Sequence, residues 1–381
     1  MDRDEDVGLV RRFFALQATR ADELGPSVYR QPAADYTSEE HLERERRAFF
    51  SGAPLLAGLS ADIPNAGDYL TLSSGDGVPV VVVRGDDGVA RGLVNTCRHR
   101  GARLVEDRGH AHRCLVCPYH SWTYDLTGQL TAQPGAGDGF SGLERADLGL
   151  RPVPVAEGHG LVFVRPGSDA PIDLDATLAG LGPELDSYKL AGYHHVETRS
   201  HVQPCNWKMV IDTFLEAYHI FSLHRQSIAP HYFSSGALFD PYGPHSRFIG
   251  LRRSILELQD QPEESWSILP HSTLHYVLVP NALLVHQIDH FELWRVFPLG
   301  VDRSLVHTGL YAPAPPSDER AQRYWRKNLD AVLQVTTEED FPQCAKIQAD
   351  LGAGALDELL FGRNEAALAH YHRSLSGMMG P

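Results

Sequence analysis

The sequence predicts an α+β fold, in which a small all-β domain is inserted in, or precedes, a larger α+β domain with an antiparallel sheet flanked by helices. Three observations predict it. Residues 1–50 have helical character, residues 51–165 form short apolar runs separated by glycine, and residues 166–381 mix helical patterns with long strands. We therefore expect a helical segment at 1–50 that packs on the larger domain, a β domain at 51–165, and the larger domain at 166–381.

The first two segments contain clear element signals. A helix is expected from Ser38, which is a good N-cap residue followed by acids in the first turn. Five strands are expected in the β domain, because alternating or continuous apolar runs end at glycine-rich turns. They lie at 68–72, 78–85, 90–95, 121–130 and 160–166.

The third segment alternates between helical and strand periodicity. Three strands are expected at 273–280, 282–298 and 304–313. Three helices are expected: one over 206–224, one from the N-cap Ser317 through residue 333, and one from 336 to Gly352, whose glycine suits a C-cap.

Composition limits the classes of partner. The 381 residues have 34 basic and 49 acidic side chains, for a net charge of −15, so nucleic acid and anionic membranes are not expected partners. No secretory signal and no apolar stretch of about 20 residues is visible. The five cysteines are odd in number and unevenly clustered, which favours reduced thiols, metal binding and a cytoplasmic location.

Two short pairs of metal-binding residues stand out in the β domain. Cys97-x-His99 and Cys117-x-x-His120 each bring one thiolate and one imidazole to a tight loop. Such a set suits tetrahedral zinc, or a [2Fe-2S] cluster with both cysteines on one iron and both histidines on the other. Zinc fingers usually place two cysteines on one knuckle, so the mixed pairs favour the cluster. Cys114 is left over and is expected to be a small buried thiol.

The helix expected at 206–224 suggests a second metal site. On a regular helix, five apolar residues share one face, which indicates core packing: Trp207, Ile211, Phe214, Tyr218 and Phe221. Asp212, Glu216 and His219 fall on the opposite face, and His224 follows five residues after His219. Two imidazoles near carboxylates fit a 2-His-1-carboxylate iron(II) site, although a solvated polar helix face is the alternative. The chain must then kink or unwind after Tyr218, since residues five apart point in different directions.

These motifs resemble those of one known family. Cys97-x-His99-Arg-Gly with Cys117-Pro-Tyr-His120-x-Trp resembles the Rieske motif of the Rieske non-haem iron oxygenases, and residues 206–224 resemble the iron-binding segment of their alpha subunits. The resemblance implies a [2Fe-2S] cluster on the four residues of the two pairs.

The resemblance also implies a set of residues for a mononuclear iron(II). His219 and His224 would be ligands, and residues 336–351 would supply the third, with Asp340 the first choice and Glu339 the alternate. Glu216 would be the acid that links a Rieske histidine to the iron, with Asp212 as a further acid of the site. Without the resemblance, Thr336 and the acids after it would be an ordinary helix start.

The implied activity is that of an oxygenase component, which uses dioxygen to hydroxylate or oxidatively demethylate a small organic substrate. Electrons would come from a separate NAD(P)H-dependent reductase or ferredoxin, because the chain lacks a dinucleotide-binding glycine loop. In the family, they pass between neighbours of a homotrimer, here from His120 of one subunit to Glu216 and His219 of the next. Glutamate instead of the usual aspartate at the bridge occurs in a subset that includes quaternary-ammonium oxygenases, but it does not identify the substrate.

The substrate pocket is expected between residues 216–223 and the sheet at 283–296, with His286, His290 and Trp294 as polar or stacking contacts. Two other classes of function are also considered. One is an electron carrier or binding protein with an inactive catalytic domain, and the other is a zinc-stabilised interaction protein.

Overall fold

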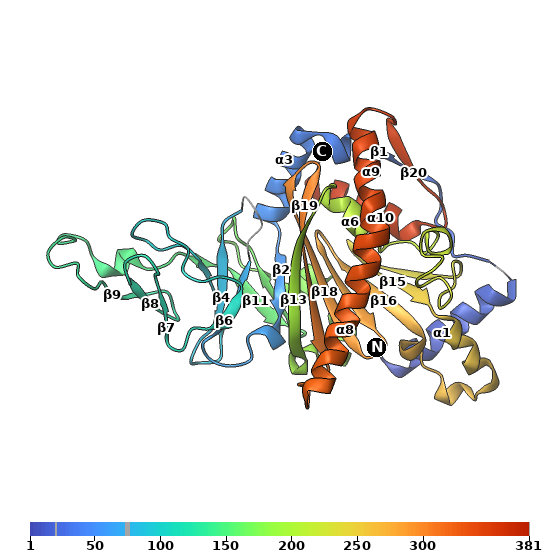
Figure 1. Cartoon of the computed structure of the whole chain (residues 1–381), viewed down its shortest axis with the longest axis horizontal. Coiled ribbons are helices and arrows are strands. Elements are labelled where there is room, and N and C mark those ends of the chain that lie inside the picture. Colours follow the sequence, from blue (N-terminus) through green and yellow to red (C-terminus); the bar gives the residue numbers. More distant parts are fainter. Residues whose placement is uncertain (20, 73–76, 381) are drawn as a thin grey trace. The chain divides into compact units, whose positions relative to one another are not determined.

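A computed structural model describes residues 1–19, 21–72 and 77–380 (Figure 1). Contacts divide the chain into two units. The first comprises Met1–Glu45, Leu178–Tyr188 and Tyr193–Pro381, and the second comprises Arg46–Thr177 and Lys189–Gly192. That the three segments expected from the sequence are separate domains remains a prediction. No helix within the described ranges has the length and apolarity needed to span a lipid bilayer.

The second unit is built on antiparallel β-sheets, as expected. A five-stranded sheet has the order β10-β5-β4-β3-β6, and two three-stranded sheets have the orders β11-β12-β2 and β7-β8-β9. The strands are β2 Leu55–Leu59, β3 Asp68–Leu72, β4 Val80–Arg84, β5 Ala90–Val94, β6 Arg108–His110, β7 Cys114–Val116, β8 Thr123–Asp125, β9 Leu130–Ala132, β10 Pro152–Val153, β11 Val155–Gly158 and β12 Leu161–Val164. Helical turns are η1 Arg46–Gly52, η2 Ser60–Asp62, η3 Arg145–Leu148, α4 Leu174–Leu178 and η4 Leu190–Gly192.

The first unit is built on a seven-stranded antiparallel sheet with the order β13-β19-β18-β17-β16-β15-β14. Its strands are β13 His194–Gln203, β14 Leu238–Tyr242, β15 His245–Leu251, β16 Ser272–Leu278, β17 Ala282–Gln287, β18 His290–Gly300 and β19 Arg303–Ala312, and β1 Tyr29–Pro32 pairs separately with β20 Glu358–Phe361. The single strand expected at 282–298 is wrong. It is a hairpin of β17 and β18, in which Gln287 pairs with His290 across the turn residues Ile288 and Asp289.

Helices complete the first unit. They are α1 Arg3–Thr19, α2 Ala34–Thr37, α3 Glu39–Glu45, α5 Gly182–Ser187, α6 Trp207–Asp212, α7 Ile220–Leu223, α8 Glu319–Val335, α9 Phe341–Gly352 and α10 Ala366–Met379, with shorter turns η5 Arg253–Asp260, η6 Glu263–Ser265 and η7 Leu269–His271. The expected cap Ser38 is confirmed, since its hydroxyl accepts from the His41 amide at 3.2 Å. The cap of α8 is Asp318, which accepts from the Ala321 amide, instead of Ser317.

A helix start at Thr336 is also wrong. Residues Thr336–Asp340 form a π-helical segment, η8, inside one continuous helical run from Glu319 to Gly352. The hydroxyls of Thr336 and Thr337 donate to main-chain carbonyls of the preceding turn, including Leu333, and so satisfy acceptors in the widened turn. Segments of this kind often occur at functional sites, because they redirect side chains within a helix.

The helix expected over 206–224 is interrupted earlier than predicted. Helix α6 ends at Asp212 and α7 begins only at Ile220, so the chain is irregular over 213–219. Trp207 and Ile211 are fully buried, as expected of a core face. Tyr218 and Phe221 are 70% and 69% exposed, so their assignment to the core was wrong: the helical periodicity does not continue across the break.

Candidate metal centres and substrate pocket

The two loops of the second unit that contain the Cys–His pairs have the same backbone hydrogen bonds. The Cys97 amide donates to the Ala102 carbonyl, and the Cys117 amide donates to the Trp122 carbonyl, both at 2.8 Å. In each loop, the cysteine carbonyl accepts from the amide four residues on, where Gly101 and Ser121 both have positive φ. The expectation of matched loops is therefore confirmed by the backbone.

The side chains of these loops converge within the second unit. Cys97 and Cys117 are buried, and the rings of His99 and His120 lie 4.6 Å apart. Burial raises the pKa of the Cys97 thiol, and the adjacent Cys117 thiol raises it further. His99 stacks on Trp122 at 4.9 Å, and among the described residues its buried Nδ1 atom has no hydrogen-bond partner. Two adjacent thiols and two neighbouring imidazoles, one of them with an unpartnered ring nitrogen, fit the donor set that a two-iron cluster of this type requires.

Cys114 precedes the second loop. It opens β7 and pairs with Asp125 of β8, and it is partly exposed instead of buried as we expected.

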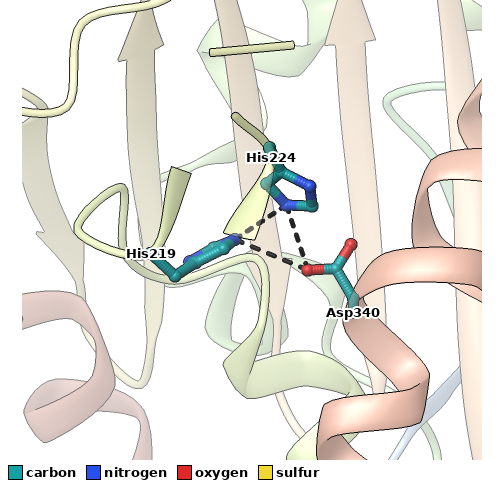
Figure 2. Close-up of side chains that lie close together, drawn as sticks. All are labelled: His219, His224 and Asp340. Carbon is teal, nitrogen blue, oxygen red and sulfur yellow. Dashed lines mark hydrogen bonds and ion pairs between the residues drawn. The ribbon is translucent and has the colours of Figure 1, made fainter. Parts of the chain in front are cut away.

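A second donor set lies in the first unit, around the irregular segment (Figure 2). The Nε2 atoms of His219 and His224 are 3.1 Å apart. The Oδ1 atom of Asp340 is 3.1 Å from His224 Nε2 and 3.5 Å from His219 Nε2. Three ligand atoms at about 2.1 Å from one metal ion, on one face of an octahedron, lie about 3 Å from one another. The three atoms thus have the spacing of a facial metal-binding triad.

Irregular backbone brings these side chains together. His219 immediately precedes the single turn of α7 and His224 follows it, while Asp340 is the last residue of the π-helical segment η8. His224 is 2% exposed and Asp340 is 5% exposed. The predicted kink is therefore present, but it is a longer interruption that begins after Asp212.

Two further carboxylates orient the imidazoles. Glu216 accepts hydrogen bonds from the backbone amide of His219, at 3.0 Å, and from its ring Nδ1. Glu339 Oε2 lies 2.7 Å from His224 Nδ1 and accepts from the Ser227 hydroxyl at 2.8 Å. A carboxylate at Nδ1 holds the proton on that nitrogen, so both Nε2 atoms present lone pairs to each other and to Asp340.

Electrostatics also indicate a cation at this point. Burial lowers the pKa of His224, but hydrogen bonds and charge from Asp340 and Glu339 outweigh burial, so the pKa lies above its ordinary value. Three mutually facing acceptor atoms repel one another unless a proton or a metal ion lies between them. Glu339, the alternate for the third ligand, contacts the far side of the His224 ring and is not in this group.

The triad forms part of the wall of a cavity of about 400 Å³ in the first unit. Aromatic and aliphatic side chains line much of it, including Phe214, Tyr232 and Phe248. Its charged lining comprises Glu216, Arg252, Asp289 and Glu292, besides the triad residues. A cavity of this size with a few polar groups suits a small organic ligand.

Some predicted contacts lie elsewhere. His290 lines the cavity, but Trp294 is fully buried and His286 is 6% exposed between Tyr188 and Phe291, so the latter two are core residues. Asp212 accepts from the Tyr36 hydroxyl at 2.8 Å and lies 2.9 Å from His372 Nε2.

Three residues of the site were not predicted in these roles: Glu339 as a histidine partner, and Arg252 and Glu292 in the cavity wall. Arg252 directly follows β15 and Glu292 lies within β18, and no sequence motif marks either position.

Two known families match the two units of this chain. The profile of the family described as "Rieske [2Fe-2S] domain" matches residues 54–147, and that described as "Ring hydroxylating alpha subunit (catalytic domain)" matches residues 190–380. The chain belongs to the Rieske non-haem iron oxygenases. It is the oxygenase subunit of this family, and the zinc-stabilised interaction protein is thereby excluded.

Relatives of this oxygenase include subunits named for glycine betaine and carnitine, and also the biphenyl 2,3-dioxygenase subunit alpha of Rhodococcus jostii, which is 35% identical over 189 residues, 48% of this chain and 41% of the relative. The glycine betaine monooxygenase oxygenase subunit of Chromohalobacter salexigens is 37% identical over 353 residues, covering 81% of this chain and 76% of the relative. The carnitine monooxygenase oxygenase subunit of Escherichia coli K12 is 33% identical over 200 residues, about half of each chain (51%). A crystal structure of a quaternary ammonium Rieske monooxygenase has the same fold, with a TM-score of 0.79, 20% identity, and coverage of 93% of this chain and 96% of that one.

Membership accounts for both donor sets. A Rieske domain implies a [2Fe-2S] cluster, and the catalytic domain implies a mononuclear iron. The residues present fit both groups. The orphaned His99 Nδ1 beside paired thiols suits the cluster, and the two facing imidazole nitrogens beside Asp340 suit the iron. Electrons come from a separate reductase or ferredoxin, and dioxygen is the oxidant.

Proposed function

We propose that Cys97, His99, Cys117 and His120 hold the cluster, and that His219, His224 and Asp340 hold the mononuclear iron of a terminal oxygenase. The observation that carries the second assignment is the convergence of two imidazole nitrogens and one carboxylate oxygen on the wall of a cavity. When bound, the cluster stores an electron and the iron activates dioxygen. Glu216 and Glu339 fix the two ring orientations, so that the Nε2 lone pairs are already aligned before iron binds.

We further propose that the enzyme is a homotrimer and that Glu216 is the acid through which electrons enter the mononuclear site. Glu216 contacts His219, which supports half of such a bridge. The other half would be His120 of a neighbouring subunit. Tyr218 and Phe221, which flank this segment, are large exposed aromatic side chains, and such residues are enriched at protein interfaces. This surface supports a subunit contact beside Glu216.

For the substrate, we propose an N-methylated ammonium compound that undergoes oxidative demethylation. The first support is that relatives include glycine betaine and carnitine monooxygenases. The second is Glu292, a carboxylate 1% exposed to solvent that lines the cavity together with aromatic rings, since ammonium groups are stabilised by both. One trimethylammonium group, one O2, two electrons and two protons give one dimethylammonium group, one formaldehyde and one water.

The test is a reconstituted reaction with an NAD(P)H-dependent reductase. Glycine betaine, carnitine and an aromatic hydrocarbon are each incubated, and we measure the mass of the remaining compound and trapped formaldehyde. We expect the ammonium compounds to lose one CH2 unit of mass with formaldehyde formed in equal amount. Oxidation of the hydrocarbon alone would overturn the substrate class. Colourless protein without acid-labile sulfide would overturn the cluster assignment, and reduction of the cluster without oxidation of any substrate would favour the electron carrier.

A further inference from the structure

Arg252 is a cavity residue whose environment the proposed reaction leaves unexplained. It directly follows β15, and its guanidinium carbon lies 4.7 Å from the centre of the Tyr232 ring. One of its Nη atoms donates to the Gln287 side chain at 3.1 Å. Both Tyr232 and Gln287 also line the cavity, so the guanidinium is held against the wall by neutral groups.

No carboxylate pairs with Arg252 within the described ranges, and its Nε atom is buried there without a hydrogen-bond partner. Arg165 is also half-buried with an unpartnered Nε, but it donates to the main-chain carbonyls of Ala170 and Pro171. Three other partly or fully buried arginines have carboxylate partners. Arg12 pairs with Asp240, Arg84 with Glu157, and Arg247 with Glu184. A guanidinium removed from water usually has an anionic partner, because its charge is otherwise uncompensated.

Glu292 and Asp289, the other two acids that line the cavity besides Glu216 and Asp340, contact side chains other than Arg252. Glu292 accepts from the Trp294 indole at 2.9 Å and lies 3.6 Å from His290 Nε2. Asp289 lies 2.8 Å from His290 Nδ1 and accepts from the Tyr324 hydroxyl at 2.7 Å. The cavity wall therefore contains a buried acid with aromatic neighbours, Glu292. It also contains the guanidinium of Arg252, which has no carboxylate partner among the described residues.

We infer that Arg252 binds the carboxylate of a zwitterionic ammonium substrate, and that it is the residue that selects such substrates over ammonium compounds without an acid group. This inference rests on the proposed function for the ammonium end. A planar guanidinium matches a carboxylate with two parallel hydrogen bonds, and among the described residues only one of the two Nη atoms of Arg252 has a hydrogen-bond partner, Gln287. A substrate carrying both charges would complement Glu292 and Arg252 together.

The experiment compares Arg252→Gln and Arg252→Lys with a matched control, Arg253→Gln. Arg253 is the next residue, is exposed, and lies over the Phe233 ring, which is not part of the cavity lining. Each variant is assayed on glycine betaine and on choline, which has the same trimethylammonium group but a neutral hydroxymethyl group in place of the carboxylate. Thermal stabilisation by glycine betaine, without reductase, reports binding independently of turnover.

We expect Arg252→Gln to lower kcat/KM for glycine betaine by about 10- to 150-fold, mainly through KM, because a charge-assisted hydrogen bond is lost. Activity on choline should stay within about twofold, Arg252→Lys should recover part of the loss, and Arg253→Gln should behave like the wild type. An equal loss on both substrates, or no change on glycine betaine, would overturn the inference.

Failure of the proposed function would look different. If the wild type demethylates neither compound, the ammonium class is wrong while the carboxylate anchor is still measurable. In that case the same variants are compared for stabilisation by benzoate and by its neutral amide. A preference for benzoate that Arg252→Gln abolishes supports the anchor, and equal stabilisation of all variants by both compounds overturns it.

Discussion

Replacing Asp340 and its neighbour Glu339 in two separate variants is the sharpest test of the proposed iron site. Asp340→Asn removes a carboxylate whose oxygen lies 3.1 Å and 3.5 Å from the two Nε2 atoms. Glu339→Gln removes only the charge from the far side of His224, at 2.7 Å from Nδ1, and its amide oxygen can still accept that proton. Both variants replace a carboxylate by the corresponding amide at adjacent positions. A difference in iron content between them therefore reports which side of the histidine rings each carboxylate faces.

The magnitudes follow from these positions. Removing a carboxylate that supports a metal-bound histidine lowers metal affinity by about 10- to 100-fold, or about 1.4–2.7 kcal/mol. Glutamine retains a hydrogen bond, so we expect the lower end for Glu339→Gln and the upper end for Glu339→Ala. Asp340→Asn replaces a charged ligand by a neutral one, and we expect no mononuclear iron to remain after purification.

The assay measures iron and acid-labile sulfide in the same sample, so that iron in excess of sulfide reports the mononuclear site. Glu339→Gln should keep the excess but lose it at about tenfold lower chelator concentration than the wild type. The matched control is Glu338→Gln, whose exposed side chain contacts only Gln334 among the described hydrogen bonds. Loss of the excess iron in Glu339→Gln with retention in Asp340→Asn would reverse the two assignments and refute the reasoning.

Three further predictions follow from other parts of the structure. Glu216→Gln should keep both metal centres but lose about 10- to 100-fold in turnover, measured with reductase in excess; normal coupled turnover would contradict the bridge. Replacing Tyr218 and Phe221 by serine should shift the oligomer toward monomer in sedimentation, at a cost of about 2 kcal/mol or more per aromatic side chain, whereas an unchanged oligomer would argue against this interface. Burial lowers the pKa of His286 to about 4, so the unfolded state takes up the proton first and stability falls as pH drops from about 6.5 to 4. His286→Phe should therefore lose about 2 kcal/mol less unfolding free energy than the wild type between pH 7 and pH 5 in urea titrations, and equal losses would contradict this assignment.

The sequence could predict the parts of the site that depend on short spacings. Cys97-x-His99 and Cys117-x-x-His120 each lie within one hydrogen-bonded loop. The two residues of each pair are therefore neighbours in any fold that forms this loop. His219 and His224 likewise flank a single turn. The antiparallel sheet and the all-β character of the second unit were also predictable, since both depend on apolar runs that end at turns.

The remaining features depend on contacts that periodicity does not encode. Tyr218 and Phe221 fit a helical stripe only if the helix is continuous, and the break after Asp212 places both in solvent. The π-helical segment gives no composition signal, because threonines and acids also fit an ordinary helix start. For the same reason, Glu339 and Asp340 could not be told apart from spacing alone: adjacent positions on a helix differ mainly in direction, and the widened turn decides which one faces the histidines.

The three acids around the two histidines act together on the protonation of the rings. Only Asp340 faces the Nε2 atoms, while Glu216 and Glu339 face the opposite edges of the two rings. The outer pair holds each proton on Nδ1 and so keeps each Nε2 available as a ligand, which the inner acid alone could not do. The same charges raise the pKa of His224, so a proton competes for this position whenever iron is lost. A metal ion bound by both rings would replace that proton and would contact all three acceptor atoms at once.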